Sequence, residues 1–161
     1  MFKFGQRKAA QGEILSPLTG EAVPLNQVQD QVFSTEMMGK GMAIKPTVGK
    51  VVAPVTGKIQ VLFPTKHAIG LTSDAGAEIL IHIGIDTVEL NGQHFEAFVK
   101  EGDKVKAGDT LVTFDIAAIE AAGYPTITPV IVTNSDDYSD ITPLTTGAIT
   151  AQQPLLNLVK K

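Results

Sequence analysis

Short runs of apolar and β-branched residues dominate this sequence, and Gly or Pro interrupts them roughly every eight to twelve residues. This spacing is typical of antiparallel sandwiches and barrels, whose strands are short and joined by tight turns. The chain has 161 residues, enough to bury one sizeable core. We therefore predict a single all-β domain, an antiparallel β-sandwich over residues 13–161, preceded by a flexible leader at residues 1–12.

Helices have little room between the turns, and the sequence predicts one or two short ones. Asp115 can cap a helix, and Gly123 can close its last turn. A second single turn of helix is expected to start at Asp30.

A weak internal repeat indicates how the strands are connected. Its copies are ILSPLTGEAVPL (14–25), VVAPVTGKIQVL (51–62) and ITPLTTGAIT (141–150). Each copy predicts a strand, a turn with Pro, and a second strand, because Pro presets the backbone angle of a turn and Gly tolerates positive φ. We expect the three turns to be corners of one system of sheets.

Composition excludes several classes of function. The net charge is -4 and no long basic block is present, which argues against a nucleic-acid partner. The absence of Cys excludes disulfides and thiol chemistry and favours a reducing cytoplasm. No apolar run approaches the roughly 20 residues needed to span a bilayer. The leader carries three basic residues and two Phe, so we expect a solvated tail that also allows weak, transient membrane contact.

A histidine interrupts the alternating stretch ILIHIGIDTVEL (79–90). In a strand of period two, one face is made of isoleucines only, at positions 79, 81, 83 and 85. The opposite face carries Leu80, His82, Gly84 and Asp86. His82 therefore belongs to the face away from the core.

A second histidine is expected beside the first. The segment 73–76 is a good turn, and a hairpin centred between Asp74 and Ala75 places His67 directly opposite His82, with Cβ atoms about 4.5–5.5 Å apart. Their common face is then mostly apolar with a few polar groups, which is how binding sites are usually built. Besides the two histidines it would hold Thr65, Ile69, Leu80 and Val88, with Asp86 nearby.

Two neighbouring imidazoles suit acid–base chemistry, metal binding, or nucleophilic catalysis. A neutral imidazole with a pKa near 6.5 can attack phosphorus without a separate base. The second ring can donate a hydrogen bond to the phosphoryl oxygens, and Thr65 can fix the tautomer of His67. A zinc hydrolase is the competing hypothesis, with His67, His82 and Asp86 as ligands, although the sequence has no HExxH motif.

Six segments of the chain resemble a known family, the IIA domains of the glucose family of the bacterial phosphoenolpyruvate-dependent sugar phosphotransferase system. The similarity extends over essentially the whole chain after about residue 12, and HIGIDTVEL is its most specific signature. The segments are GMAIKPT (41–47), VVAPVTGKI (51–59), TKHAIGL (65–71), ILIHIGIDTVELNG (79–92), FVKEGDKVKAGDTLVTFD (98–115) and TPVIVTN (128–134).

This resemblance implies a barrel-sandwich hybrid that acts as a phosphotransferase component in the cytoplasm. In the family, the residue matching His82 accepts a phosphoryl group from a histidine of the phosphocarrier protein HPr and donates it to a cysteine of a IIB domain. The residue matching His67 supports transfer without being phosphorylated, and Thr65 matches a family threonine. No cofactor is required, although in some relatives a partner shares zinc across the two histidines. We expect a free-standing monomer.

The family also has a shallow apolar depression where HPr and IIB dock, with acidic residues that meet arginines of HPr. Gln31 stands where a relative has an apolar residue, and Met37 and Met38 replace branched aliphatics. Methionine suits a surface that accepts two partners in turn. The alternative is a regulatory module that controls other transporters or kinases through the same surface. The matching positions are Asp30, Val32, Phe33, Met37, Met38, Phe63, Leu80, Asp86 and Val88.

Overall fold

The computed structural model describes residues 12–161, and the leader with its expected membrane contact lies outside the described residues except for Gly12. The described chain is antiparallel β-structure with two short α-helices, which confirms the predicted fold class. No helix in residues 12–161 is long and apolar enough to cross a membrane. The strands are β1 (Glu13–Leu15), β2 (Gly20–Pro24), β3 (Lys40–Pro46), β4 (Lys50–Val52), β5 (Gly57–Leu62), β6 (Ala68–Ser73), β7 (Glu78–His82), β8 (Phe95–Ala97), β9 (Lys104–Val105), β10 (Thr110–Phe114), β11 (Thr128–Val132), β12 (Tyr138–Pro143), β13 (Gly147–Ile149) and β14 (Pro154–Lys160). The helices are α1 (Gln31–Ser34) and α2 (Ile116–Ala121), with 3-10 turns η1 (Leu25–Gln27), η2 (Thr87–Leu90) and η3 (Ser135–Asp137).

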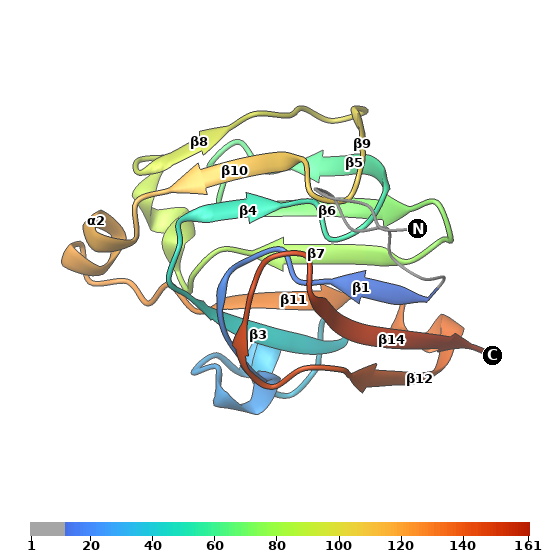
Figure 1. Ribbon diagram of the computed structural model, residues 1–161. Helices are drawn as coiled ribbons and strands as arrows, with labels where there is room; N and C mark the ends of the chain where they lie inside the picture. Colours follow the sequence, from blue (N-terminus) through green and yellow to red (C-terminus); the bar gives the residue numbers. More distant parts are fainter. Residues whose placement is uncertain (1–11) are drawn as a thin grey trace.

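The strands form one large and two small sheets. The eight-stranded sheet has the order β13-β2-β3-β11-β7-β6-β5-β9, and the small sheets are β1-β14-β12 and β4-β10-β8. In Figure 1 the strands are layered from β8 and β10 at the top to β12 and β14 at the bottom. Helix α2 projects at the end of the molecule away from the C-terminus.

The three repeat copies are corners between sheets. Each leads from a strand of a small sheet to a strand of the large one: β1 to β2, β4 to β5, and β12 to β13. The first two corners also bond to each other, because Leu15 N–H donates to the Pro54 carbonyl (3.0 Å) and Val52 N–H donates to the Pro17 carbonyl (2.9 Å). The prediction that these copies are turns of one sheet system is confirmed.

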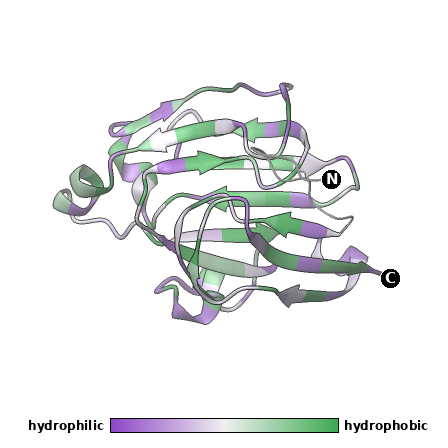
Figure 2. Ribbon diagram, viewed as in Figure 1, coloured by the Kyte–Doolittle hydropathy of each residue, from purple (hydrophilic) through white to green (hydrophobic). Residues whose placement is uncertain are grey.

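Two apolar clusters make up the core of residues 12–161. The larger one joins the faces of the three sheets, and Figure 2 shows apolar segments on many of the strands and on α2. The smaller one packs around α1 and contains Val23, Leu25, Val28, Phe33, Ala43, Ile85 and Ile131. Both helices start as predicted: Asp30 accepts a hydrogen bond from Val32 N–H (2.9 Å), and Asp115 accepts one from Ala118 N–H (3.0 Å).

The register of the β6–β7 hairpin differs by one residue from the prediction. Ser73 pairs with Ala77 through its backbone N–H (2.8 Å) and its hydroxyl (2.9 Å), so the turn contains three residues. His82 therefore pairs with Ala68, and Ile69 pairs with Ile81. Ile69 is fully buried in the larger cluster, so the prediction that it shares a face with the histidines is wrong.

The strand predicted over 79–90 also ends early, at His82. Gly84 has a φ of +77° and Asp86 a φ of +61°, and η2 follows. These left-handed conformations break the period-two alternation, because an extended strand needs negative φ. Ile83 and Ile85 consequently point into different clusters.

Candidate functional site

His67 and His82 meet although they are not partners in the ladder. Their ring centroids lie 4.9 Å apart with the ring planes at 82°. His82 ends β7, and His67 directly precedes β6, after Lys66 with its φ of +63°. The His67 carbonyl accepts a hydrogen bond from Ile83 N–H (2.6 Å), which ties the two segments together. The predicted proximity of the imidazoles is confirmed, whereas the direct cross-strand pairing is not.

The ring of His82 is fixed by the backbone two residues later. Its Nδ1 lies 2.7 Å from the Gly84 carbonyl oxygen. A carbonyl can only accept, so Nδ1 carries the hydrogen and donates it. In the neutral ring the lone pair is then on Nε2, which makes Nε2 the nucleophilic atom of His82.

The ring of His67 is fixed by a side chain. Thr65 Oγ1 lies 2.7 Å from His67 Nδ1, the contact expected from the sequence. His67 is buried and His82 is partly exposed. The pair thus has one ring below the surface and one at it.

Burial keeps both imidazoles neutral. Desolvation, followed by the nearby His82, lowers the pKa of His67 to about 4. Desolvation also lowers the pKa of His82, while the Gly84 hydrogen bond and the carboxylates of Asp30 and Asp86 oppose this shift. At neutral pH both rings therefore have a lone pair and a single N–H.

Two phenylalanine rings pack against the two imidazoles. The ring of Phe33 lies 4.9 Å from that of His82, and the ring of Phe63 lies 5.4 Å from that of His67. Phe33 is buried in the smaller cluster, whereas Phe63 is 39% exposed. The two rings make the surroundings of the imidazoles apolar.

The predicted docking residues lie on or beside α1, the loop after it, the connection between β5 and β6, β7 and η2. Asp30 is partly exposed at the N-cap of α1, Leu80 is partly exposed on β7, and Asp86 is exposed before η2. Gln31 is exposed in α1. The exposed apolar members are Val32, Met37, Met38, Phe63 and Val88. Exposed apolar side chains are what the predicted docking surface requires.

Comparison with known proteins decides the family. Residues 12–138 match the family described as "phosphoenolpyruvate-dependent sugar phosphotransferase system, EIIA 1". The chain belongs to this family. It is therefore a phosphotransferase component, as the sequence predicted.

Relatives of this EIIA chain are of two lengths. It is 57% identical over 145 residues to the "PTS system beta-glucoside-specific EIIBCA component" of Bacillus subtilis and 52% identical over 146 residues to that of Dickeya chrysanthemi. These alignments cover 90% and 91% of the chain but only 24% and 23% of the relatives, so the chain spans about a quarter of their length. It is 46% identical to the "PTS system glucose-specific EIIA component" of Oceanobacillus iheyensis, and this alignment covers 94% of the chain and 92% of the relative.

A solved structure has the same fold. The glucose permease IIA from Mycoplasma capricolum superposes with a TM-score of 0.84 at 38% identity, covering 89% of this chain and 93% of that one. The β-sandwich described above is thus the fold of this EIIA family.

The geometry of the EIIA chain does not support the zinc hydrolase. That hypothesis needs a third ligand beside His67 and His82, and Asp86 was the candidate. Within residues 12–161, no group of three or more His, Asp or Glu side chains is arranged to hold a metal ion. His94 is exposed, as predicted.

Sequence reasoning missed the role of Gly84. Its carbonyl accepts from Nδ1 of His82 and so leaves the lone pair on Nε2, and no side chain marks this role. The signal was available in the spacing, because a glycine two residues after a strand histidine can adopt the positive φ that turns its carbonyl back toward the ring.

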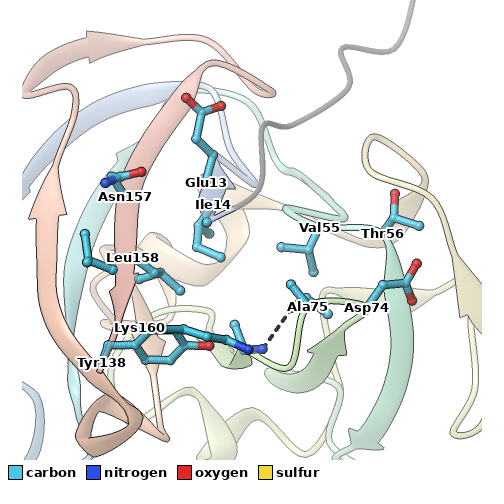
Figure 3. Close-up of a pocket in the computed structure, with 14 residues that line it drawn as sticks. Glu13, Ile14, Val55, Thr56, Asp74, Ala75, Tyr138, Asn157, Leu158 and Lys160 are labelled. Carbon is cyan, nitrogen blue, oxygen red and sulfur yellow. Dashed lines mark hydrogen bonds between the residues drawn. The ribbon is translucent and has the colours of Figure 1, made fainter.

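A separate cavity of about 900 Å³ lies at the other end of the β6–β7 hairpin. The turn residues Asp74 and Ala75 line it, together with β1 and the end of β14, whereas His67 and His82 are at the opposite end of the hairpin. Figure 3 shows Tyr138 crossing its floor and Ile14, Val55 and Leu158 around it. This cavity is therefore not the imidazole site.

Proposed function

We propose that this EIIA chain carries a phosphoryl group on Nε2 of His82, received from a phosphohistidine of HPr and passed to a cysteine of a IIB domain. The observation that supports this most is the bond from His82 Nδ1 to the Gly84 carbonyl, which leaves the lone pair on Nε2 of a ring whose centroid lies 4.9 Å from that of His67.

Acceptance is an in-line displacement at phosphorus. The Nε2 lone pair of His82 forms the new N–P bond while the N–P bond of the donor breaks and its electron pair returns to the donor imidazole. Donation reverses the roles, because a thiolate of IIB attacks phosphorus and the pair returns to Nε2 of His82. No metal or cofactor is required for either step. The apolar walls made by Phe33 and Phe63 disfavour hydrolysis by limiting access of water.

His67 stabilises the transferred group without accepting it. In this proposal the Thr65 hydroxyl, 2.7 Å from Nδ1 of His67, donates to that nitrogen, so that Nε2 of His67 carries the hydrogen and donates to a phosphoryl oxygen. The low pKa of His67, about 4, favours this neutral donor. A neutral ring also avoids holding the phosphoryl group in a salt bridge that would slow its departure.

Partner docking uses the exposed apolar residues of α1, the loop after it, and η2. Asp30 and Asp86 add negative charge next to His82, which suits the arginines of HPr. The names of the EIIBCA relatives support IIB as the acceptor. With only two histidines in the site, zinc would bind here only with ligands from a partner. All of these partners imply a cytoplasmic location.

Transfer through a purified chain of components tests this function. The EIIA chain is phosphorylated with phosphoenolpyruvate, enzyme I and HPr, freed of them, and mixed with the IIB domain of the Bacillus subtilis relative. We expect the phosphoryl group to appear on the IIB cysteine, and a Cys→Ser IIB variant is the matched control. A phosphorylated EIIA chain that leaves IIB unmodified would contradict the assigned acceptor.

A further inference from the structure

The support for the Gly84 carbonyl comes from Thr87, a residue outside the described chemistry. Thr87 is one of the few polar side chains that are fully buried, at 0% exposure. Its hydroxyl donates a hydrogen bond to the Ile83 carbonyl, four residues earlier. This bond closes the segment between the end of β7 and η2 into a small loop that contains Gly84.

The methyl group of Thr87 packs against Gly84 itself. A Cβ atom at position 84 would lie 2.6 Å from Thr87 Cγ2 and 2.7 Å from the Pro125 carbonyl oxygen. The same Pro125 carbonyl accepts a hydrogen bond from Ile85 N–H (3.2 Å). Gly84, with its φ of +77°, is thus clamped between Thr87 and Pro125, and its peptide cannot rotate without moving one of them.

The bond from Thr87 reaches both imidazoles through the backbone of Ile83. The Ile83 carbonyl accepts from Thr87, and the Ile83 N–H donates to the His67 carbonyl (2.6 Å). The next carbonyl, that of Gly84, accepts from Nδ1 of His82. The buried hydroxyl of Thr87 therefore holds the Ile83–Gly84 peptide, whose neighbouring backbone groups bond to His67 and to His82.

We propose that Thr87 is a positioning residue for phosphoryl transfer: its hydroxyl fixes the Ile83–Gly84 backbone and thereby the tautomer and orientation of the His82 ring. This inference rests on the proposed function of His82. Thr87 does not contact the phosphoryl group, because it is completely covered. Its contribution is to keep Nε2, and not Nδ1, as the nitrogen with the lone pair.

Thr87→Val and Thr87→Ser separate the hydroxyl from the methyl contact. The tautomer of His82 is read from the ¹⁵N shifts of its ring in the unphosphorylated chain, and the rate of acceptance is measured over a range of phospho-HPr concentrations up to saturation. We expect a single Nδ1–H tautomer in wild type and Thr87→Ser. In Thr87→Val we expect a mixture of tautomers and a maximal rate lower by roughly tenfold to a hundredfold, with an unchanged KM for HPr. If Thr87→Val does not fold, Thr87→Ala is read in the same way, since its small side chain admits water to the Ile83 carbonyl.

Thr128→Val is the matched control. Thr128 is equally buried and its hydroxyl also donates to a backbone carbonyl, that of Thr126 (2.9 Å), so the variant loses a comparable bond without touching Ile83 or Gly84. We expect it to keep the wild-type tautomer and rate. A folded Thr87→Val chain with the tautomer and rate of wild type would overturn the role of Thr87 and leave the proposed function of His82 intact. A wild-type chain that accepts no phosphoryl group would overturn the proposed function and, with it, this role.

Discussion

The imidazole rings of His67 and His82 lie edge to face, 4.9 Å apart, and each is tethered through its own Nδ1. The tether of His82 is a backbone carbonyl and that of His67 is a hydroxyl. A carbonyl requires a hydrogen on Nδ1, whereas a hydroxyl can give one to it. The two Nε2 atoms can therefore differ in protonation: that of His82 offers a lone pair to a phosphoryl group, and that of His67 offers an N–H.

Replacement of His67 separates acceptance from donation. We predict that His67→Gln or His67→Ala still accepts a phosphoryl group from HPr but passes it to IIB slower by roughly a hundredfold, because a donor to the phosphoryl oxygens is lost. Quenched-flow measurement of each half-reaction checks this. If His67→Ala blocked acceptance while His82→Ala did not, the two roles would be reversed.

The free energy of unfolding is expected to fall as the pH drops from about 6.5 toward 4. The pKa of His67 is about 4 in the folded chain against 6.5 for the free side chain, so between these values the unfolded chain binds the proton and the folded one does not. Protonation then favours unfolding, and stability rises with pH across this window. Urea unfolding at several pH values measures the slope, which His67→Gln should reduce. An equal slope in that variant would show that another group is responsible.

Asp30 has two functions that substitutions can separate. As the N-cap of α1 it accepts from Val32 N–H, and its charge raises the pKa of His82. Asp30→Asn keeps a good cap and should leave stability nearly unchanged while lowering the pKa of His82, whereas Asp30→Ala should also lose about 1 kcal/mol of stability. Thermal unfolding and NMR titration of His82 distinguish these effects. A His82 pKa that is the same in Asp30→Asn and wild type would contradict the electrostatic role.

Ile69 and Val88 should respond in opposite ways to truncation. Ile69 is 0% exposed, so Ile69→Ala should cost about 2–5 kcal/mol of stability and leave HPr affinity of the folded chain unchanged. Val88 is 46% exposed, so Val88→Ala should change stability by less than about 0.5 kcal/mol and weaken HPr binding. Denaturation and binding calorimetry test both. Unchanged HPr affinity in Val88→Ala would remove this residue from the docking surface.

Much of the fold was readable because it depends on local chemistry. The Pro and Gly turns, the caps at Asp30 and Asp115, and the apolar alternation of β7 act over a few residues each, and the sequence shows them directly. The division into three sheets was not readable, because it depends on pairings such as that of the two corners at Pro17 and Pro54, far apart in the chain.

The sequence predicted that the two histidines lie close together, but it did not predict the register of the β6–β7 hairpin. The difference arises at Ser73, whose hydroxyl bonds to Ala77 N–H and adds one residue to the turn. Because of this difference, Ile69, which was predicted on the docking face, lies in the core. A turn of two or three residues is decided by a balance of a few hydrogen bonds, which an apolar pattern does not record.

Intact-mass spectrometry tests the central claim most directly. The purified chain is incubated with phosphoenolpyruvate, enzyme I and HPr, and its mass is measured before and after acid treatment, in parallel with His82→Ala and with His67→Ala as the matched control. We predict one added phosphoryl mass in wild type and His67→Ala, lost in acid and absent from His82→Ala. A phosphoryl mass that persists in His82→Ala, or none in the wild-type chain, would contradict the assignment of His82 as the phosphoryl acceptor.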